Sequence, residues 1–139
     1  MSGKLYLKDK LVDEELDLSM MQLTEIPVKE IEQLGSKVLK LNLSHNLLTC
    51  VPANLPLLTQ LTSIDLSKNQ IVELPENFGQ LTKLKSLDLY SNQISKLPVS
   101  FAQLKSLKFL DLKENPLVPE LAKAAGPCIT ANDCAKGFF

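Results

Sequence analysis

The sequence contains no tryptophan, a single histidine and few aromatic residues, which make up 5 % of its 139 residues. Aliphatic side chains must therefore supply nearly all of a hydrophobic core. The single histidine, His45, has no Cys-His or Ser-His-Asp set to join, so catalytic and metal sites lack their commonest member. Only 5 glycines occur and none cluster, which excludes a glycine-rich phosphate loop. We expect no catalytic residue, no cofactor and no metal, and therefore a chain that is not an enzyme.

An excess of charge of either sign is also missing. The 15 basic and 16 acidic residues give a net charge of −1, so nothing attracts the whole chain to nucleic acid or anionic lipid. The first residues carry charges throughout, unlike a secretory signal, and no apolar run approaches the length of a membrane span. These features predict one soluble domain, residues 1–139, in a reducing compartment, with a small-molecule ligand unlikely to be its partner.

Asparagine recurs at a fixed interval. Successive copies are 23 residues apart, and they are Asn46, Asn69, Asn92 and Asn115. A fixed period of this size indicates stacked structural units. Each asparagine can bond neighbouring backbone groups where the chain leaves a strand, so we expect the four to form a structural ladder.

Leucine or isoleucine stands three and five positions before each asparagine, as in Leu87 and Leu89 before Asn92. This alternation predicts a short strand with one face toward the core. A Leu-Pro or Val-Pro pair follows in most repeats and ends the extended segment. Because a single unit cannot bury its own apolar face, the strands must line up in a parallel sheet over a continuous aliphatic core.

The boundaries follow from the repeat. About five units occupy residues 16–117, preceded by an N-terminal cap at residues 1–15, expected to be a short turn or helix, and followed by a C-terminal cap at residues 118–139, with a helix from about Val118 to Ala125. Cys50 falls inside a repeat and is predicted to be a buried free thiol. Cys128 and Cys134 are expected to stay reduced.

The strand positions between the core leucines point outward, onto the concave side that repeat proteins offer to partners. The central column of this face includes Asp65, Asp88 and Asp111, which could attract cations or basic peptides or could serve the fold alone. Tyr90 and Phe109 are expected to be exposed anchors for a partner, although the C-terminal cap could instead cover Phe109. The rest of the predicted binding patch is basic: His45, Lys68 and Lys113.

The pattern LxxLxLxxNxLxxLPxxFxxLxx resembles the leucine-rich repeat family in its 23-residue intracellular form, over about residues 11–120. The resemblance implies an α/β solenoid, with short parallel strands on the concave face, loops or short helical turns on the convex face, and a cap at each end. It also implies a non-catalytic module that binds proteins.

Four stretches resemble more closely the ribosome-associated members of this family at the endoplasmic reticulum membrane. They are KDKL at residues 8–11, ELDLS at 15–19, LPVSFAQLKSLKFLDLKENPL at 97–117 and LAKAAG at 121–126. This closer resemblance implies a domain on the cytosolic side of that membrane, partners such as the ribosome or growth factors, and a role in nuclear import of growth factors. The alternative is a soluble intracellular scaffold that binds a small GTPase or a phosphatase.

Overall fold

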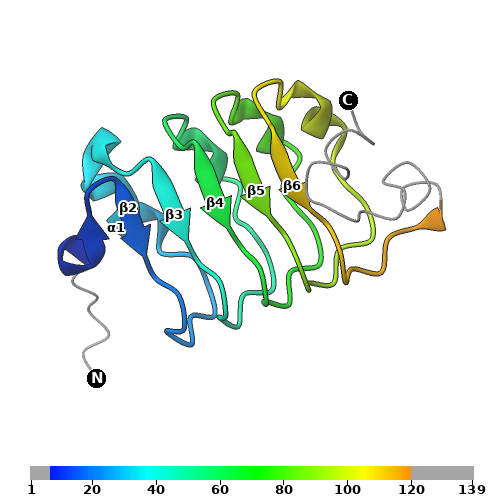
Figure 1. Ribbon diagram of the computed structural model, residues 1–139, viewed down its shortest axis with the longest axis horizontal. Coiled ribbons are helices and arrows are strands. Elements are labelled where there is room, and N and C mark those ends of the chain that lie inside the picture. Colours follow the sequence, from blue (N-terminus) through cyan, green and yellow to red (C-terminus); the bar gives the residue numbers. More distant parts are fainter. Residues whose placement is uncertain (1–6, 120–139) are drawn as a thin grey trace.

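The computed structural model describes residues 7–119. Its centre is a sheet whose strands lie side by side in chain order, as Figure 1 shows from blue to orange. The strands are β1 (Leu11–Val12), β2 (Glu15–Asp17), β3 (Lys40–Asn42), β4 (Ser63–Asp65), β5 (Ser86–Asp88) and β6 (Phe109–Asp111). β2 to β6 pair in parallel, and β1 is antiparallel to β2. The predicted solenoid of stacked parallel strands is confirmed.

The strand register repeats the interval found in the sequence. Ser63 pairs with Ser86, and Ser86 with Phe109, so residues 23 apart lie next to each other. The sequence interval between paired residues of β2 and β3 is longer, because Glu15 pairs with Lys40. Equal spacing means that each position of the repeat forms a column running across the sheet, with neighbours about 4.8 Å apart.

Short helical segments make up a second row away from the strands (Figure 1). They are the α-helix α1 (Val28–Gln33) and the 3₁₀ turns η2 (Gly35–Lys37), η3 (Leu55–Leu57), η4 (Phe78–Gln80) and η5 (Val99–Gln103). The 3₁₀ turn η1 (Leu7–Lys10) lies apart from this row, at the N-terminal end of the sheet beside β1 and β2. Between the two rows lies the core. Its main columns are formed by inward strand residues that are at most 2 % exposed, such as Leu87 and Leu89. The rings of Phe78 and Phe101 stack on the helical side, with centres 6.4 Å apart.

The asparagines tie each unit to the one before it. Nδ2 of Asn92 donates to the carbonyl oxygens of Leu66 at 2.9 Å and Leu89 at 3.1 Å, and Oδ1 accepts from the amide of Ile71 at 3.0 Å. Asn46, Asn69 and Asn115 make the same kinds of bond. Each amide therefore satisfies backbone groups of two units, and Asn46, Asn69 and Asn92 do so in buried places.

The N-terminal segment closes the open end of the core with the buried side chain of Leu7, which is 4 % exposed. The sequence suggested a short turn or helix here; η1 is such a turn, and β1 adds an antiparallel strand that the repeat pattern does not encode. The predicted helix from Val118 to Ala125, and with it Cys128 and Cys134, falls almost wholly outside the described residues.

The prediction for Cys50 is wrong, because its thiol is exposed. The matching positions of the next two repeats hold Glu73 and Lys96, both of which are also exposed. These charged residues mark a position that points away from the core. The sequence therefore contained the signal that Cys50 faces solvent.

Candidate partner-binding surface

The concave face consists of the strand residues, and those just after them, that point away from the core. Its central column runs across all five parallel strands as Asp17, Asn42, Asp65, Asp88 and Asp111. The register therefore brings Asp65, Asp88 and Asp111 together as neighbours on β4, β5 and β6. Asp17 lies at the other end of the column, beyond the neutral Asn42.

Every side chain of the central column bonds the backbone two residues further on. Oδ1 of Asp65 accepts from the amide of Ser67 at 2.9 Å and from its hydroxyl at 2.7 Å. Asp17 and Asn42 receive the same pair of bonds from Ser19 and Ser44. These turns fix the direction of the chain as it leaves each strand.

The pair of bonds is incomplete on the last two strands. Oδ1 of Asp88 accepts only from the amide of Tyr90, at 3.0 Å, and Oδ1 of Asp111 only from the amide of Lys113, at 2.9 Å. Tyrosine and lysine have no hydroxyl on Cβ, so the second donor is lost. Lys113 offsets this loss, because its ammonium lies 3.5 Å from Oδ2 of Asp111. Asp88 has no such cation beside it among the described ion pairs.

The pKa values of two carboxyls in the column are shifted in opposite directions. The hydroxyl of Ser19 and then its amide, together with the positive charge of Lys10, hold the pKa of Asp17 below its usual value of 3.8, although burial opposes this slightly. Burial raises the pKa of Asp88, and the negative charges of Asp65 and Asp111 add to the effect. The bond from Tyr90 and the charge of Lys113 oppose that rise without cancelling it. The centre of the face therefore has a negative potential.

Tyr90 and Phe109 flank the central carboxylates instead of touching each other. Phe109 pairs with Ser86 at the start of β5, and Tyr90 comes four residues later, so the two rings are roughly 13 Å apart along the strand direction. Phe109 is 42 % exposed and Tyr90 is half-buried. Lys68 lies over the ring of Tyr90, with Nζ 5.1 Å from the ring centre. The exposed Phe109 and the half-buried Tyr90 thus lie on opposite sides, along the strand direction, of the acidic column formed by Asp65, Asp88 and Asp111.

The column that precedes each asparagine differs from an ordinary strand column. His45, Lys68 and Ser91 have positive φ angles of 55°, 58° and 58°, which place them in the left-handed region where the chain turns. His45 is exposed and lies one strand farther from the acidic column than Lys68. Of the eight predicted binding residues, seven gather on β4 to β6 and the turns that follow them, whereas His45 stands at their edge.

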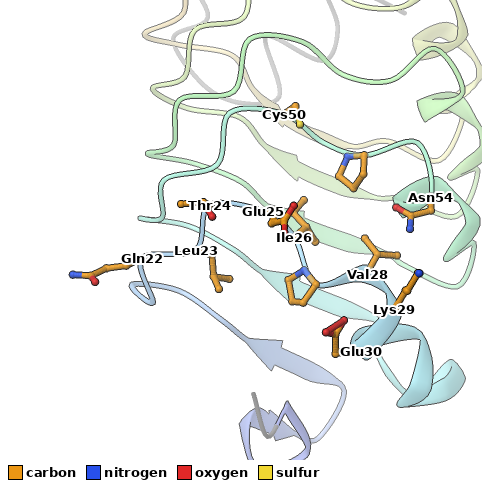
Figure 2. Close-up of a pocket in the computed structure, with 12 residues that line it drawn as sticks. Gln22, Leu23, Thr24, Glu25, Ile26, Val28, Lys29, Glu30, Cys50 and Asn54 are labelled. Carbon is orange, nitrogen blue, oxygen red and sulfur yellow. The ribbon is translucent and has the colours of Figure 1, made fainter. Parts of the chain in front are cut away.

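A hollow of the described surface lies away from the concave face, between the first and second units. It is an open groove of about 640 Å³ between residues 22–30 and residues 50–54. Figure 2 shows Glu25, Ile26 and Lys29 on one side, with Cys50 and Asn54 on the other. The sequence did not predict this groove. It accompanies the longer first unit, which forms α1 where later units have single 3₁₀ turns.

The described residues hold neither a metal-binding cluster nor a membrane-spanning helix. Among residues 7–119, no His, Cys, Asp and Glu side chains form a group of three or more able to hold a metal ion, so the acidic column is too spread out for one. No helix in this range is long and apolar enough to cross a membrane. What the concave face offers is a broad strip of carboxylates, two aromatic rings and two lysines.

Comparison with known proteins supports the repeat architecture. Residues 59–117 match a family model described as Leucine rich repeat. A leucine-rich repeat protein of Leptospira interrogans has a similar structure, with a TM-score of 0.66 and 40 % identity over 71 % of this chain. The matched part is 25 % of that bacterial chain, so this chain spans a quarter of its length.

A second similar structure comes from the Drosophila melanogaster SNF/U2A′ complex. Its TM-score is 0.63 and its identity 23 %, over 88 % of this chain and 78 % of that chain, a likeness that concerns the fold alone. None of the curated proteins matches this chain.

Proposed function

We infer that this leucine-rich repeat solenoid, an architecture that the family model and both similar structures support, is a protein-interaction module that binds its partner on the concave face. The observation that carries the inference is the placement of the exposed Phe109 and the half-buried Tyr90 on either side of a carboxylate column on the sheet. Aromatic residues on such surfaces are favoured binding anchors, because they bury much area while losing little side-chain entropy.

The fold itself favours this kind of function. Stacked units give an extended, preformed surface whose side chains are ordered by the strands, so a partner can bind without first ordering the sheet. The structure from Drosophila is one of a complex, which fits a fold that serves assembly. The described charged groups suit binding better than catalysis, since His45 is separated from the carboxylates.

We further propose that the partner is the ribosome and that the chain belongs on the cytosolic side of the endoplasmic reticulum membrane. Support comes from the four sequence stretches, above all residues 97–117, that resemble leucine-rich repeat-containing protein fifty-nine. Residues 97–117 include β6 with Phe109 and the turn with Lys113, so the stretch that carries the resemblance also forms one end of the concave surface. Nuclear import of growth factors is a second role that the same resemblance suggests.

The test is co-sedimentation of the purified chain with ribosomes over a series of salt concentrations. We expect the wild-type chain to sediment with ribosomes and the Tyr90→Ala, Phe109→Ala double variant to lose at least about tenfold in affinity, as removal of two anchor residues does. The matched control is Leu57→Ala, Val72→Ala, which removes two exposed apolar side chains outside the concave face.

Equal binding by the wild type and the double variant, with the fold intact by circular dichroism, would remove the concave site from this proposal. Absence of ribosome binding by the wild type would instead favour the soluble scaffold. Pull-down with purified small GTPases and phosphatases is then the next measurement.

A further inference from the structure

The charge of the acidic column is not needed for the fold. Asn42 occupies the same column and receives the same bonds, from the amide of Ser44 at 3.0 Å and from its hydroxyl at 2.8 Å. An amide oxygen can therefore accept the same two bonds as a carboxylate oxygen. The hydrogen bonds of these turns do not require the negative charge of Asp65, Asp88 and Asp111, and we call this charge surplus.

This surplus charge is moreover unfavourable within the folded chain. Three carboxylates on adjacent strands repel one another, and burial of Asp88 removes part of its hydration. Only Oδ1 of Asp65 and of Asp88 accepts a described hydrogen bond, so Oδ2 of each is left for another donor. Asp65 and Asp88 are register partners on neighbouring strands, which lie about 4.8 Å apart, so a planar donor can reach an oxygen of each.

Two lysines of the chain itself lie near these carboxylates. Lys68 lies over the Tyr90 ring, and Lys113 lies beside Asp111. Both lysines are at the end of the strands where Tyr90 lies, whereas the other end holds Phe109. A cation that enters over β4 and β5 therefore meets two carboxylate oxygens that no lysine occupies, with an aromatic ring toward either end.

We propose that the concave face takes an arginine side chain from a basic segment of the partner, with the guanidinium bridging Asp65 and Asp88. Arginine fits better than lysine because its planar fork donates to two carboxylates at once and stacks on aromatic rings. This inference rests on the proposed function and names the chemistry of the partner. The open groove between the first two units has no comparable set of charges.

The test is isothermal titration of the purified chain with three peptides, hexa-arginine, hexa-lysine and hexa-citrulline, at about 0.15 M salt, where weak surface attraction is largely screened. Citrulline keeps the shape of arginine without its charge. We expect hexa-arginine to bind several-fold more tightly than hexa-lysine, and hexa-citrulline not to bind. In Asp65→Asn, Asp88→Asn we expect a loss of about tenfold for hexa-arginine, because charge-assisted bonds are replaced by neutral ones.

The matched control is Glu73→Gln, Glu76→Gln, which removes the same amount of charge from exposed positions outside the concave face. Its affinity for hexa-arginine should stay within about twofold of the wild type, since distant exposed charges are screened. If this control loses as much affinity for hexa-arginine as the aspartate variant, net charge alone explains the effect and the proposed site is wrong. Equal affinity for hexa-lysine would overturn the choice of arginine.

Failure of this inference and failure of the proposed function give different results. If ribosomes bind in a manner that needs Tyr90 and Phe109 but not Asp65 and Asp88, the module stands and the arginine site falls. If hexa-arginine binds as described and ribosomes do not, the site stands and the partner is another protein with a basic segment.

Discussion

At the scale of single residues, the side chain two positions after each central carboxylate decides how well that carboxylate is satisfied. Ser19 gives Asp17 two hydrogen bonds, and the pKa of Asp17 is lowered. Tyr90 gives Asp88 one bond, and the pKa of Asp88 is raised by burial and by its charged neighbours. Tyrosine at the position where the preceding unit has serine thus adds an aromatic ring and leaves the carboxylate with one donor fewer.

The raised pKa of Asp88 predicts that this carboxylate costs stability near neutral pH. The folded chain holds the proton more tightly than the unfolded chain, so stability falls as pH rises from the usual aspartate pKa of 3.8 through the folded value. Asp88→Asn should therefore raise the free energy of unfolding near pH 7, on the order of 0.5 kcal/mol because the group is partly solvated. Urea unfolding near pH 7 and near pH 4 should show this gain shrinking at the lower pH.

Asp17→Asn is the matched control, with the opposite sign. The pKa of Asp17 is lowered in the folded chain, so its ionised form stabilises the fold above the usual pKa, and this contribution is lost as pH falls through the folded value. The variant should be less stable than the wild type near neutral pH. A change of the same sign in both variants would mean that the protonation of these two carboxyls does not set their contributions to stability.

At the scale of elements, the strands were predictable and the contacts between turns were not. Alternating leucines such as Leu87 and Leu89 specify a strand, and the exact interval of 23 residues specifies its neighbours. The helical side follows no such rule. Gly79 of η4 corresponds in the repeat to Pro56 and Ala102, so nothing in the sequence marks it as special.

The same distinction holds for the candidate site. Its columns could be predicted, since each is one position of the repeat carried across parallel strands. The separation of Tyr90 from Phe109 and the position of Lys68 over Tyr90 could not, because they depend on where each strand ends and on side-chain directions. The outward direction of Cys50 was readable from Glu73 and Lys96, but only by comparing repeats position by position.

Gly79→Ala should destabilise the chain. The amide of Gly79 donates to the hydroxyl of Ser100 at 2.8 Å, and an added Cβ would overlap the backbone carbonyl oxygen of Ser100. η4 and η5 must then move apart, at a cost of about 2 kcal/mol by analogy with overpacked cores. Urea unfolding measures the loss. Gln80→Ala, an exposed neighbour on η4, should change stability by less than about 0.5 kcal/mol, and equal losses would rule out the contact with Ser100 as the cause.

At the scale of the whole molecule, the strand pairs among the described residues join only neighbouring units. The parallel pairs and the asparagine bonds all join consecutive units, so stability is close to a sum of units and of the interfaces between them. The concave surface that we propose for binding extends over β4, β5 and β6. The stability of this surface therefore depends on the two interfaces that join β4 to β5 and β5 to β6.

The position of an asparagine along the solenoid should then decide how far its loss spreads. Asn92 is 3 % exposed between units on both sides, and its removal leaves the buried amide of Ile71 without its partner. The carbonyl of Leu66 loses one of its two side-chain donors and keeps Nδ2 of Asn69. Asn92→Ala should cost about 3 kcal/mol, because several buried groups lose their bonds. Asn115 makes matching bonds near the end of the described chain but is only half-buried, so water can replace part of them in Asn115→Ala.

Hydrogen exchange should show Asn92→Ala exposing amides of β4, β5 and β6 together, and Asn115→Ala exposing β6 and the turn after it. Equal spread in the two variants would mean that the solenoid unfolds as one unit, and that the binding strands share the stability of the whole chain instead of that of their own interfaces.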